Sequence, residues 1–147
     1  TLRIEMGHIA GSELDGRTIP YDNSLEGLVS KKKDFIGKRS LDRKAFIAED
    51  RQKVVGVVPI DKKTSIPEGS HLVKDAMAPI PNPKLGYISA SCWSVEYDNP
   101  FSLAILKDGK NMIGQKLFAM SPLKNKTIPV EIVSSHYVDP KGERVRS

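Results

Sequence analysis

The residues whose types could support catalysis are few, and their spacing forms no recognisable catalytic set. The histidines, His8, His71 and His136, are spread along the chain, and Cys92 is its one cysteine. No order of nucleophile, histidine and carboxylate predicts a triad, and no glycine-rich phosphate loop precedes a helix. A closed zinc site usually takes four clustered cysteine or histidine ligands, which this scattered set disfavours. The sequence therefore predicts no catalytic residue and no metal site within this chain.

Positive charge is the second chemical feature, and it is concentrated between Lys31 and Lys53. The chain has 23 Lys and Arg against 18 Asp and Glu, a net charge of +5. A charge run of this kind is most often a solvated face, and the functional alternative is a patch that attracts an anionic ligand. Nucleic acid is the weaker form of that alternative, because only Phe35 and Phe46 are interleaved as stacking platforms. The basic residues are Lys31, Lys32, Lys33, Lys38, Arg39, Arg43, Lys44, Arg51 and Lys53.

The elements that position these residues differ between the two parts of the chain. In the first part, residues 10–23 are rich in Gly, Asp and Ser and predict a long ordered loop. Residues 25–30 predict a short strand. Residues 34–47 predict a short helix, in which Leu41 and Ala45 are one turn apart.

From Gln52 the pattern changes to β-branched runs separated by turn residues, so a boundary falls near residue 50. Asp108-Gly109, between two such runs, predicts the tip of a hairpin. Several short strands without helices between them predict an antiparallel barrel over about residues 52–140. The expected fold class is mainly β with a short α-helical N-terminal part.

One strand of the predicted barrel, LGYISASCW, contains Cys92. Strict alternation places Cys92 on the same, apolar face as Ile88 and Ala90, with Trp93 on the other face. Buried structural thiols are far commoner than reactive ones in such a setting. We therefore expect Cys92 to be buried and unreactive.

Length and composition indicate a globular protein. At 147 residues the chain is one domain, or one small domain and the tail of another. No apolar run approaches the roughly 20 residues of a membrane helix, and one cysteine excludes an internal disulfide, so we expect a soluble protein of the reducing cytoplasm. The start at Thr1 resembles neither a signal nor a transit peptide. Because it also lacks an initiator Met and reads like the middle of an element, we expect a fragment of a longer chain.

Three motifs carry a resemblance to a known family: RIEMG from Arg3, the loop DGRTIP from Asp15, and DFIGKRSL from Asp34. Together they resemble the signature of the glycine-cleavage T-protein (aminomethyltransferase) superfamily, and GYISAS from Gly86 is similar to a later strand of it. Within the superfamily the chain is most similar to the alpha subunits of sarcosine oxidases. A T-protein or a dimethylglycine-dehydrogenase-type enzyme is the nearest alternative. A β-barrel interaction module with a basic partner-binding face is an alternative of another class.

The resemblance implies that residues 1–50 are the tail of a folate-binding domain and residues 51–147 the family's C-terminal barrel. It implies that Glu5 binds the pterin of tetrahydrofolate and that Lys33, or its neighbour Lys32, attracts the folate tail. The parent enzyme would oxidise sarcosine with flavin and transfer the one-carbon unit to tetrahydrofolate. Its flavin and NAD sites and its catalytic aspartate would lie elsewhere, and its partners would be the remaining alpha-subunit domains and the other subunits. No nucleic acid or membrane partner is implied, and this piece alone would be inactive.

Overall fold

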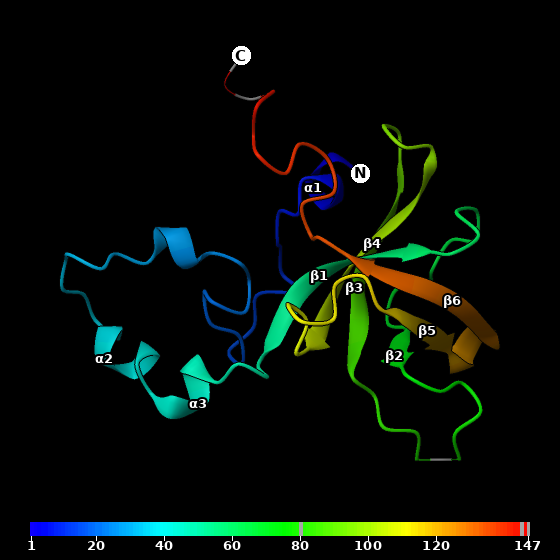
Figure 1. Ribbon diagram of the computed structural model, residues 1–147, viewed down its shortest axis with the longest axis horizontal. Coiled ribbons are helices and arrows are strands. Elements are labelled where there is room, and N and C mark those ends of the chain that lie inside the picture. The colour runs from blue at the N-terminus through cyan, green and yellow to red at the C-terminus, as the bar shows by residue number, and fades with distance from the viewer. Residues whose placement is uncertain (80, 145, 147) are drawn as a thin grey trace.

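The change of pattern at Gln52 coincides with the start of the first strand. The computed structural model describes residues 1–79, 81–144 and 146 (Figure 1). Short helices precede the strands: α1 (Leu2–Glu5), the 3-10 turn η1 (Glu26–Leu28), α2 (Lys38–Leu41) and α3 (Lys44–Ile47). The later elements are β1 (Gln52–Pro59), β2 (His71–Val73), β3 (Gly86–Ser94), β4 (Asn99–Lys107), β5 (Lys116–Ser121), the 3-10 turn η2 (Pro122–Lys124) and β6 (Lys126–Val133).

The strands form a closed antiparallel barrel in the order β1-β4-β3-β2-β5-β6, with β6 pairing back onto β1. Closure leaves no free sheet edge, so each strand is hydrogen-bonded on both sides. The β1–β4 pairing runs from Gln52 opposite Lys107 to Val57 opposite Ser102. This architecture confirms the predicted fold class and the antiparallel barrel.

Alternation along the strands fills the barrel interior with aliphatic side chains. Val55 and Val57 of β1 point inward, as do Ala104 and Leu106 of β4. All four remaining strands also contribute side chains to the interior. Inward and outward side chains alternate along each strand, which is the period-2 pattern of a sheet with an apolar face. The interior core consists of Val55, Val57, Ile66, Leu72, Ile88, Ala104, Leu106, Met112, Leu117, Ala119, Ile128, Val130 and Ile132.

A second apolar cluster covers the outside of β1, β3 and β4. Phe101 is fully buried there, and its ring stacks on Tyr137 of the C-terminal segment at 4.4 Å and 4°. Ile4 of α1 packs into the same cluster, so the N- and C-terminal segments both cover this face. Position 56 of β1, which lies against this cluster, must be glycine. A Cβ there would stand 2.7 Å from the Phe101 ring and 2.3 Å from the Ser134 carbonyl. The segment that carries Glu5 is thus packed on the barrel.

Residues 24–50, named here the lobe, extend to one side of the barrel (Figure 1). The predicted strand at residues 25–30 is wrong: the segment holds the turn η1, and no strand pairs with it in the barrel. The predicted helix at 34–47 forms in part, as α2 and α3. It is interrupted at Arg43, whose backbone is extended with φ −64° and ψ 139°.

Asp108-Gly109 is not a hairpin tip, because β4 pairs with β1 and β3 whereas β5 pairs with β2 and β6. The local turn chemistry is nevertheless present. Asp108 has a positive φ of 54°, and the Gly109 N–H donates to the Leu106 carbonyl at 3.1 Å. The turn therefore ends β4, and the chain continues to a strand on another side of the barrel.

Candidate functional site

Glu5 ends the one-turn helix α1 and is 6% exposed. Its Oε1 accepts the Val95 N–H at 2.9 Å, at the tip of the β3–β4 hairpin. Its backbone carbonyl accepts the N–H groups of Tyr137 and Val138, both at 3.1 Å. Oε2 accepts no hydrogen bond from any residue in the described part of the chain. The result is a carboxylate held at one oxygen, with acceptor capacity left over.

Glu13 is a second buried carboxylate, and sequence reasoning missed it. It is fully buried, and its Oε2 accepts the Ala10 N–H at 2.8 Å and lies 3.4 Å from Arg3 Nη1. Oε1 has no hydrogen-bond partner of normal geometry among the described residues. Burial raises the pKa of Glu13, but the neighbouring Ser89 hydroxyl, the Ala10 N–H, the Ser12 hydroxyl and the charge of Arg3 outweigh it, so the pKa lies below its ordinary value. No local pattern in the loop signalled this burial.

Lys33 lies on the surface of the lobe, in an open hollow of about 600 Å³ that Lys31 and Lys32 also line. Its backbone N–H donates to Ser30 Oγ at 2.9 Å, and its carbonyl accepts Lys38 Nζ at 2.9 Å. These contacts order the backbone and leave the Lys33 ammonium in solvent. No hydrogen bond or ion pair in the described residues joins the lobe's Lys33 to Glu5.

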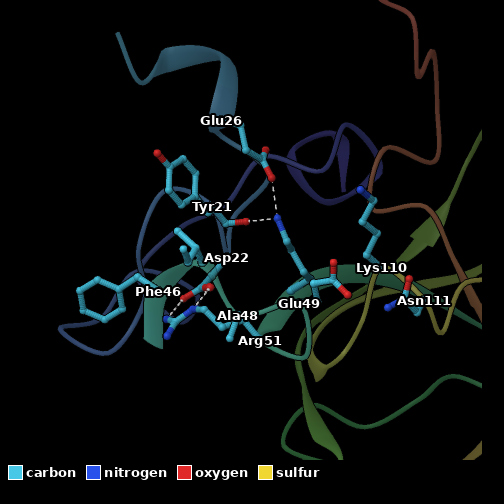
Figure 2. Close-up of a pocket in the computed structure, with 11 residues that line it drawn as sticks. Tyr21, Asp22, Glu26, Phe46, Ala48, Glu49, Arg51, Lys110 and Asn111 are labelled. Carbon is cyan, nitrogen blue, oxygen red and sulfur yellow. Dashed lines mark hydrogen bonds and ion pairs between the residues drawn. The ribbon is translucent and has the colours of Figure 1, made fainter. Parts of the chain in front are cut away.

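A cleft of about 370 Å³ separates the lobe from the barrel (Figure 2). Arg51, which directly precedes β1, pairs with buried Asp22 at 2.5 Å, and its guanidinium lies over the Phe46 ring at 5.1 Å. Hydrogen bonding to Asp22 raises the pKa of Arg51, because the pair favours the charged form. Lys110 lines the side of the cleft opposite Phe46 (Figure 2). We name this hollow the Arg51 cleft.

A second ion pair crosses the Arg51 cleft. Lys53 of β1 donates from Nζ to Glu26 Oε1 at 2.5 Å and also binds the Tyr21 carbonyl. Burial raises the pKa of Glu26, but the hydrogen bond and charge of Lys53, the Glu26 backbone N–H and the charge of Lys110 together outweigh it, so the pKa is lowered. The cleft is lined by three basic and three acidic side chains: Arg51, Lys53 and Lys110 against Asp22, Glu26 and Glu49. Its charges are balanced within the protein, so it does not select an ion of either sign.

Cys92 is only half-buried, so the prediction that it is buried is wrong. The β3–β4 register shifts between Ile88 and Ala90, which makes a β-bulge at Ser89. Ile88 therefore faces the interior core, whereas Ala90 and Cys92 join the outer cluster. Burial raises the pKa of the Cys92 thiol, and the negative charge of Glu5 raises it further. A raised pKa reduces the thiolate fraction, so this cysteine is a poor nucleophile near neutral pH.

Among the residues that the structure describes, no group of three or more His, Cys, Asp or Glu side chains is placed to hold a metal ion. Within the same residues, no helix has the length and apolar character needed to cross a membrane.

The fold is similar to that of one part of a solved aminomethyltransferase. The crystal structure of glycine cleavage system aminomethyltransferase T from Bartonella henselae superposes with a TM-score of 0.74 at 20% identity, over 94% of this chain and 37% of that chain. At that identity the likeness concerns the fold alone. No family model matches the chain.

Sequence relatives give the more specific match. The chain is 36% identical to sarcosine oxidase subunit alpha of Rhizobium meliloti (strain 1021) over 98% of its length. It is 37% identical to the same subunit of Corynebacterium sp. (strain U-96) over 97%. It spans about 15% of the length of these relatives. The chain is thus homologous to a segment of the sarcosine oxidase alpha subunit, which confirms the predicted resemblance.

Proposed function

We propose that this chain is the C-terminal part of a sarcosine oxidase alpha subunit and that it contributes there to binding tetrahydrofolate. The observation that carries the proposal is 36–37% identity to such subunits over nearly the whole chain. In the parent enzyme, sarcosine would be oxidatively demethylated and its one-carbon unit passed to folate, with the flavin and NAD sites and the catalytic groups outside this chain. Residues 1–50 would complete the folate-binding domain, and residues 51–147 would form its C-terminal barrel.

Glu5 has the chemistry that a pterin ring requires. A pterin presents its 2-amino group and its N3–H side by side, and one ionised carboxylate accepts both in a charge-assisted pair. Oε2 of Glu5 takes no hydrogen bond from the described residues, and Oε1 retains a lone pair beside its bond to Val95. The Val95 contact and the packing of Ile4 immobilise the carboxylate, which lowers the entropic cost of binding. Bound folate supplies the acceptor for the one-carbon unit, and Glu5 would hold its ring in position.

Lys33 would contribute a weaker, longer-range attraction to the carboxylates of the folate tail. Its ammonium is a point charge without the fork of an arginine, so the contact would be loose. Lys32, exposed beside it, is the alternative. Because Glu5 and Lys33 lie on different parts of the molecule, we propose that other segments of the alpha subunit complete the pocket between them.

The test measures tetrahydrofolate affinity in the complete alpha subunit at low and high ionic strength. Glu5→Gln keeps the acceptor for Val95 but turns an amide donor toward the pterin's donors, so we expect affinity to fall about ten- to a hundredfold. Lys33→Ala should cost about fivefold or less, and the loss should fade with salt. Lys124→Ala, which removes an exposed lysine beside β6, is the matched control. Wild-type folate affinity in Glu5→Gln would show that the pterin assignment is wrong.

A further inference from the structure

A second cleft, of about 590 Å³, lies on the other side of Arg51 from the Arg51 cleft. Ala48 and Arg51 line both hollows and form the wall between them. The rest of its lining comes from segments far apart in the sequence: Arg17 of the N-terminal loop, Tyr87 of β3 and Lys107 of β4 among them. We name it the junction cleft, because it follows the line where the lobe meets the barrel.

The two clefts differ in charge. The junction cleft is lined by four basic side chains, Arg17, Arg51, Lys84 and Lys107, against one acidic side chain, Asp50. Arg17 and Arg51 are paired with Asp15 and Asp22, so Lys84 and Lys107 supply the positive charge that is available to a ligand. The Arg51 cleft has three of each sign. A concave surface lined by one sign of charge concentrates counter-ions, because its low-dielectric walls focus the field. The junction cleft therefore attracts anions, and its neighbour does not.

Two of these cationic side chains, Lys84 and Lys107, have few or no partners among the described residues of the protein. Lys84 makes no hydrogen bond or ion pair with any residue in the described ranges. Lys107 Nζ lies 3.8 Å from Asp50 Oδ2, at the limit of an ion pair, and the two side chains are 65% and 70% exposed. By contrast, the guanidinium of Arg51 is committed to Asp22 and to the Ala45 carbonyl. Lys84 and Lys107 are thus the groups that a ligand would engage.

The floor of the junction cleft offers apolar surface beside the charges. Tyr87 is half-buried, packs against the outer cluster and lines the cleft together with Leu85. An organic anion with an apolar part would cover this surface while its charged groups met the lysines.

We propose that the junction cleft binds a small polyanion, a molecule with two or more carboxylate or phosphate groups, through Lys84 and Lys107. The site goes beyond the folate contact at Glu5 and does not depend on it. Glu5 contacts Val95, which follows the last residue of β3, whereas Tyr87 is the second residue of that strand. At about 3.3 Å per residue the length of β3 separates the two contacts by roughly 25 Å. A ligand held at Tyr87 therefore occupies a different place from a ring held at Glu5.

The experiment titrates the full chain with two probes at low ionic strength, a glutamate hexapeptide and tripolyphosphate, and measures the dissociation constants by calorimetry. We expect at least one probe to bind, and Lys84→Ala/Lys107→Ala to weaken that binding about three- to tenfold. Lys124→Ala/Lys126→Ala removes the same charge from exposed positions on the far turn of the barrel and should keep the wild-type constant. The probe that binds more tightly identifies carboxylate or phosphate as the preferred group.

Two further measurements test whether the probe binds at Lys84 and Lys107. Lys84→Arg/Lys107→Arg keeps the charge and should retain most of the affinity. In the wild-type chain, bound probe should shift the amide resonances of Gly86 and Tyr87, a readout that needs no variant. An equal loss of affinity in the control pair would mean that only bulk charge matters and would overturn the proposal. So would the failure of both probes to bind, or shifts confined to the lobe's Lys31–Lys33.

Discussion

The barrel and the lobe are joined in one chain but are stabilised in different ways. The strands of the barrel enclose an aliphatic interior, with Val57, Leu72 and Leu106 fully buried. In the lobe, residues 24–50, no residue is buried, and Leu28 and Ile36 are 80% and 104% exposed. Barrel stability therefore comes from apolar burial within a closed sheet, whereas the lobe depends on the few polar contacts that attach it to the barrel.

Those contacts converge on Arg51, just before β1, and on Lys53 within it. Arg51 binds Asp22 and the Ala45 carbonyl, and Lys53 binds Glu26. The apolar side chains Leu28 and Ile36 of the lobe are exposed and do not form a core. If the chain is part of a larger subunit, as we propose, the lobe is the region whose packing the rest of that subunit would complete.

We expect the largest loss of folding stability when the Phe101 ring is removed from the outer cluster. Phe101→Ala leaves a cavity between Gly56 and Tyr137, and we expect it to lower the free energy of unfolding by about 3 to 5 kcal/mol. Ile36→Ala in the lobe is the matched control and should change it by less than about 0.5 kcal/mol, because this side chain is fully exposed. Urea unfolding at neutral pH measures both. Equal losses would contradict the contrast between barrel and lobe.

A smaller effect is expected at the attachment between the two regions. Asp22→Asn removes the charge that binds Arg51 while preserving the shape of the buried side chain, and should cost about 1.5 to 3 kcal/mol. Amide hydrogen exchange should speed up across the lobe and remain slow in β1 and β4. The exposed pair of Asp15 and Arg17 offers a control, and Asp15→Asn should leave the unfolding midpoint near that of the wild type. Slow exchange in the lobe of Asp22→Asn would show that some other contact holds it.

The smallest expected effect concerns a single turn of the barrel, which is stabilised by its own local hydrogen bonds. Asp61, in the turn after β1, accepts bonds from the Thr64 hydroxyl and from the N–H groups of Thr64 and Lys63, which lower its pKa from 3.8 to about 2. A depressed pKa stabilises the folded state above about pH 3.8, and this contribution is lost as the pH falls toward 2.

The variant Thr64→Ala removes the largest of these contributions, so the pKa of Asp61 should rise toward 3.8 while two N–H bonds remain. A titration of the carboxyl resonance by NMR measures the shift. Thr127→Ala, at an exposed site on β6, should leave the pKa of Asp61 unchanged. A wild-type Asp61 that titrates near 3.8 would contradict the hydrogen-bonded turn.

Sequence reasoning succeeded where the signal is local. The start of β1 at Gln52 and the antiparallel barrel follow from side-chain alternation and from the turn residues between short β-branched runs. The lobe was harder to predict. Residues 25–30 have the apolar content of a strand, but no neighbouring strand is free to pair with them, and Arg43 interrupts the run predicted as one helix.

For the candidate site, Glu5 and Lys33 followed from the family resemblance alone, and their roles in folate binding stay predictions. The structure adds their surroundings: a buried carboxylate held by Val95 in one case and an exposed ammonium in the other. Glu13 could not have been predicted, because its burial depends on Arg3 and on the bulged Ser89, which is distant in the chain.

By itself the sequence determined that an antiparallel barrel of short strands begins near Gln52, since the hydrophobic effect acts on each residue through its own side chain. Only the tertiary structure decided that β4 lies between β1 and β3, that the bulge at Ser89 turns Cys92 outward, and that basic side chains outnumber acidic ones in one cleft but equal them in its neighbour. These features depend on pairing between distant segments. One added residue in a strand reverses the face of every side chain after it, and no local pattern in the sequence signals that reversal.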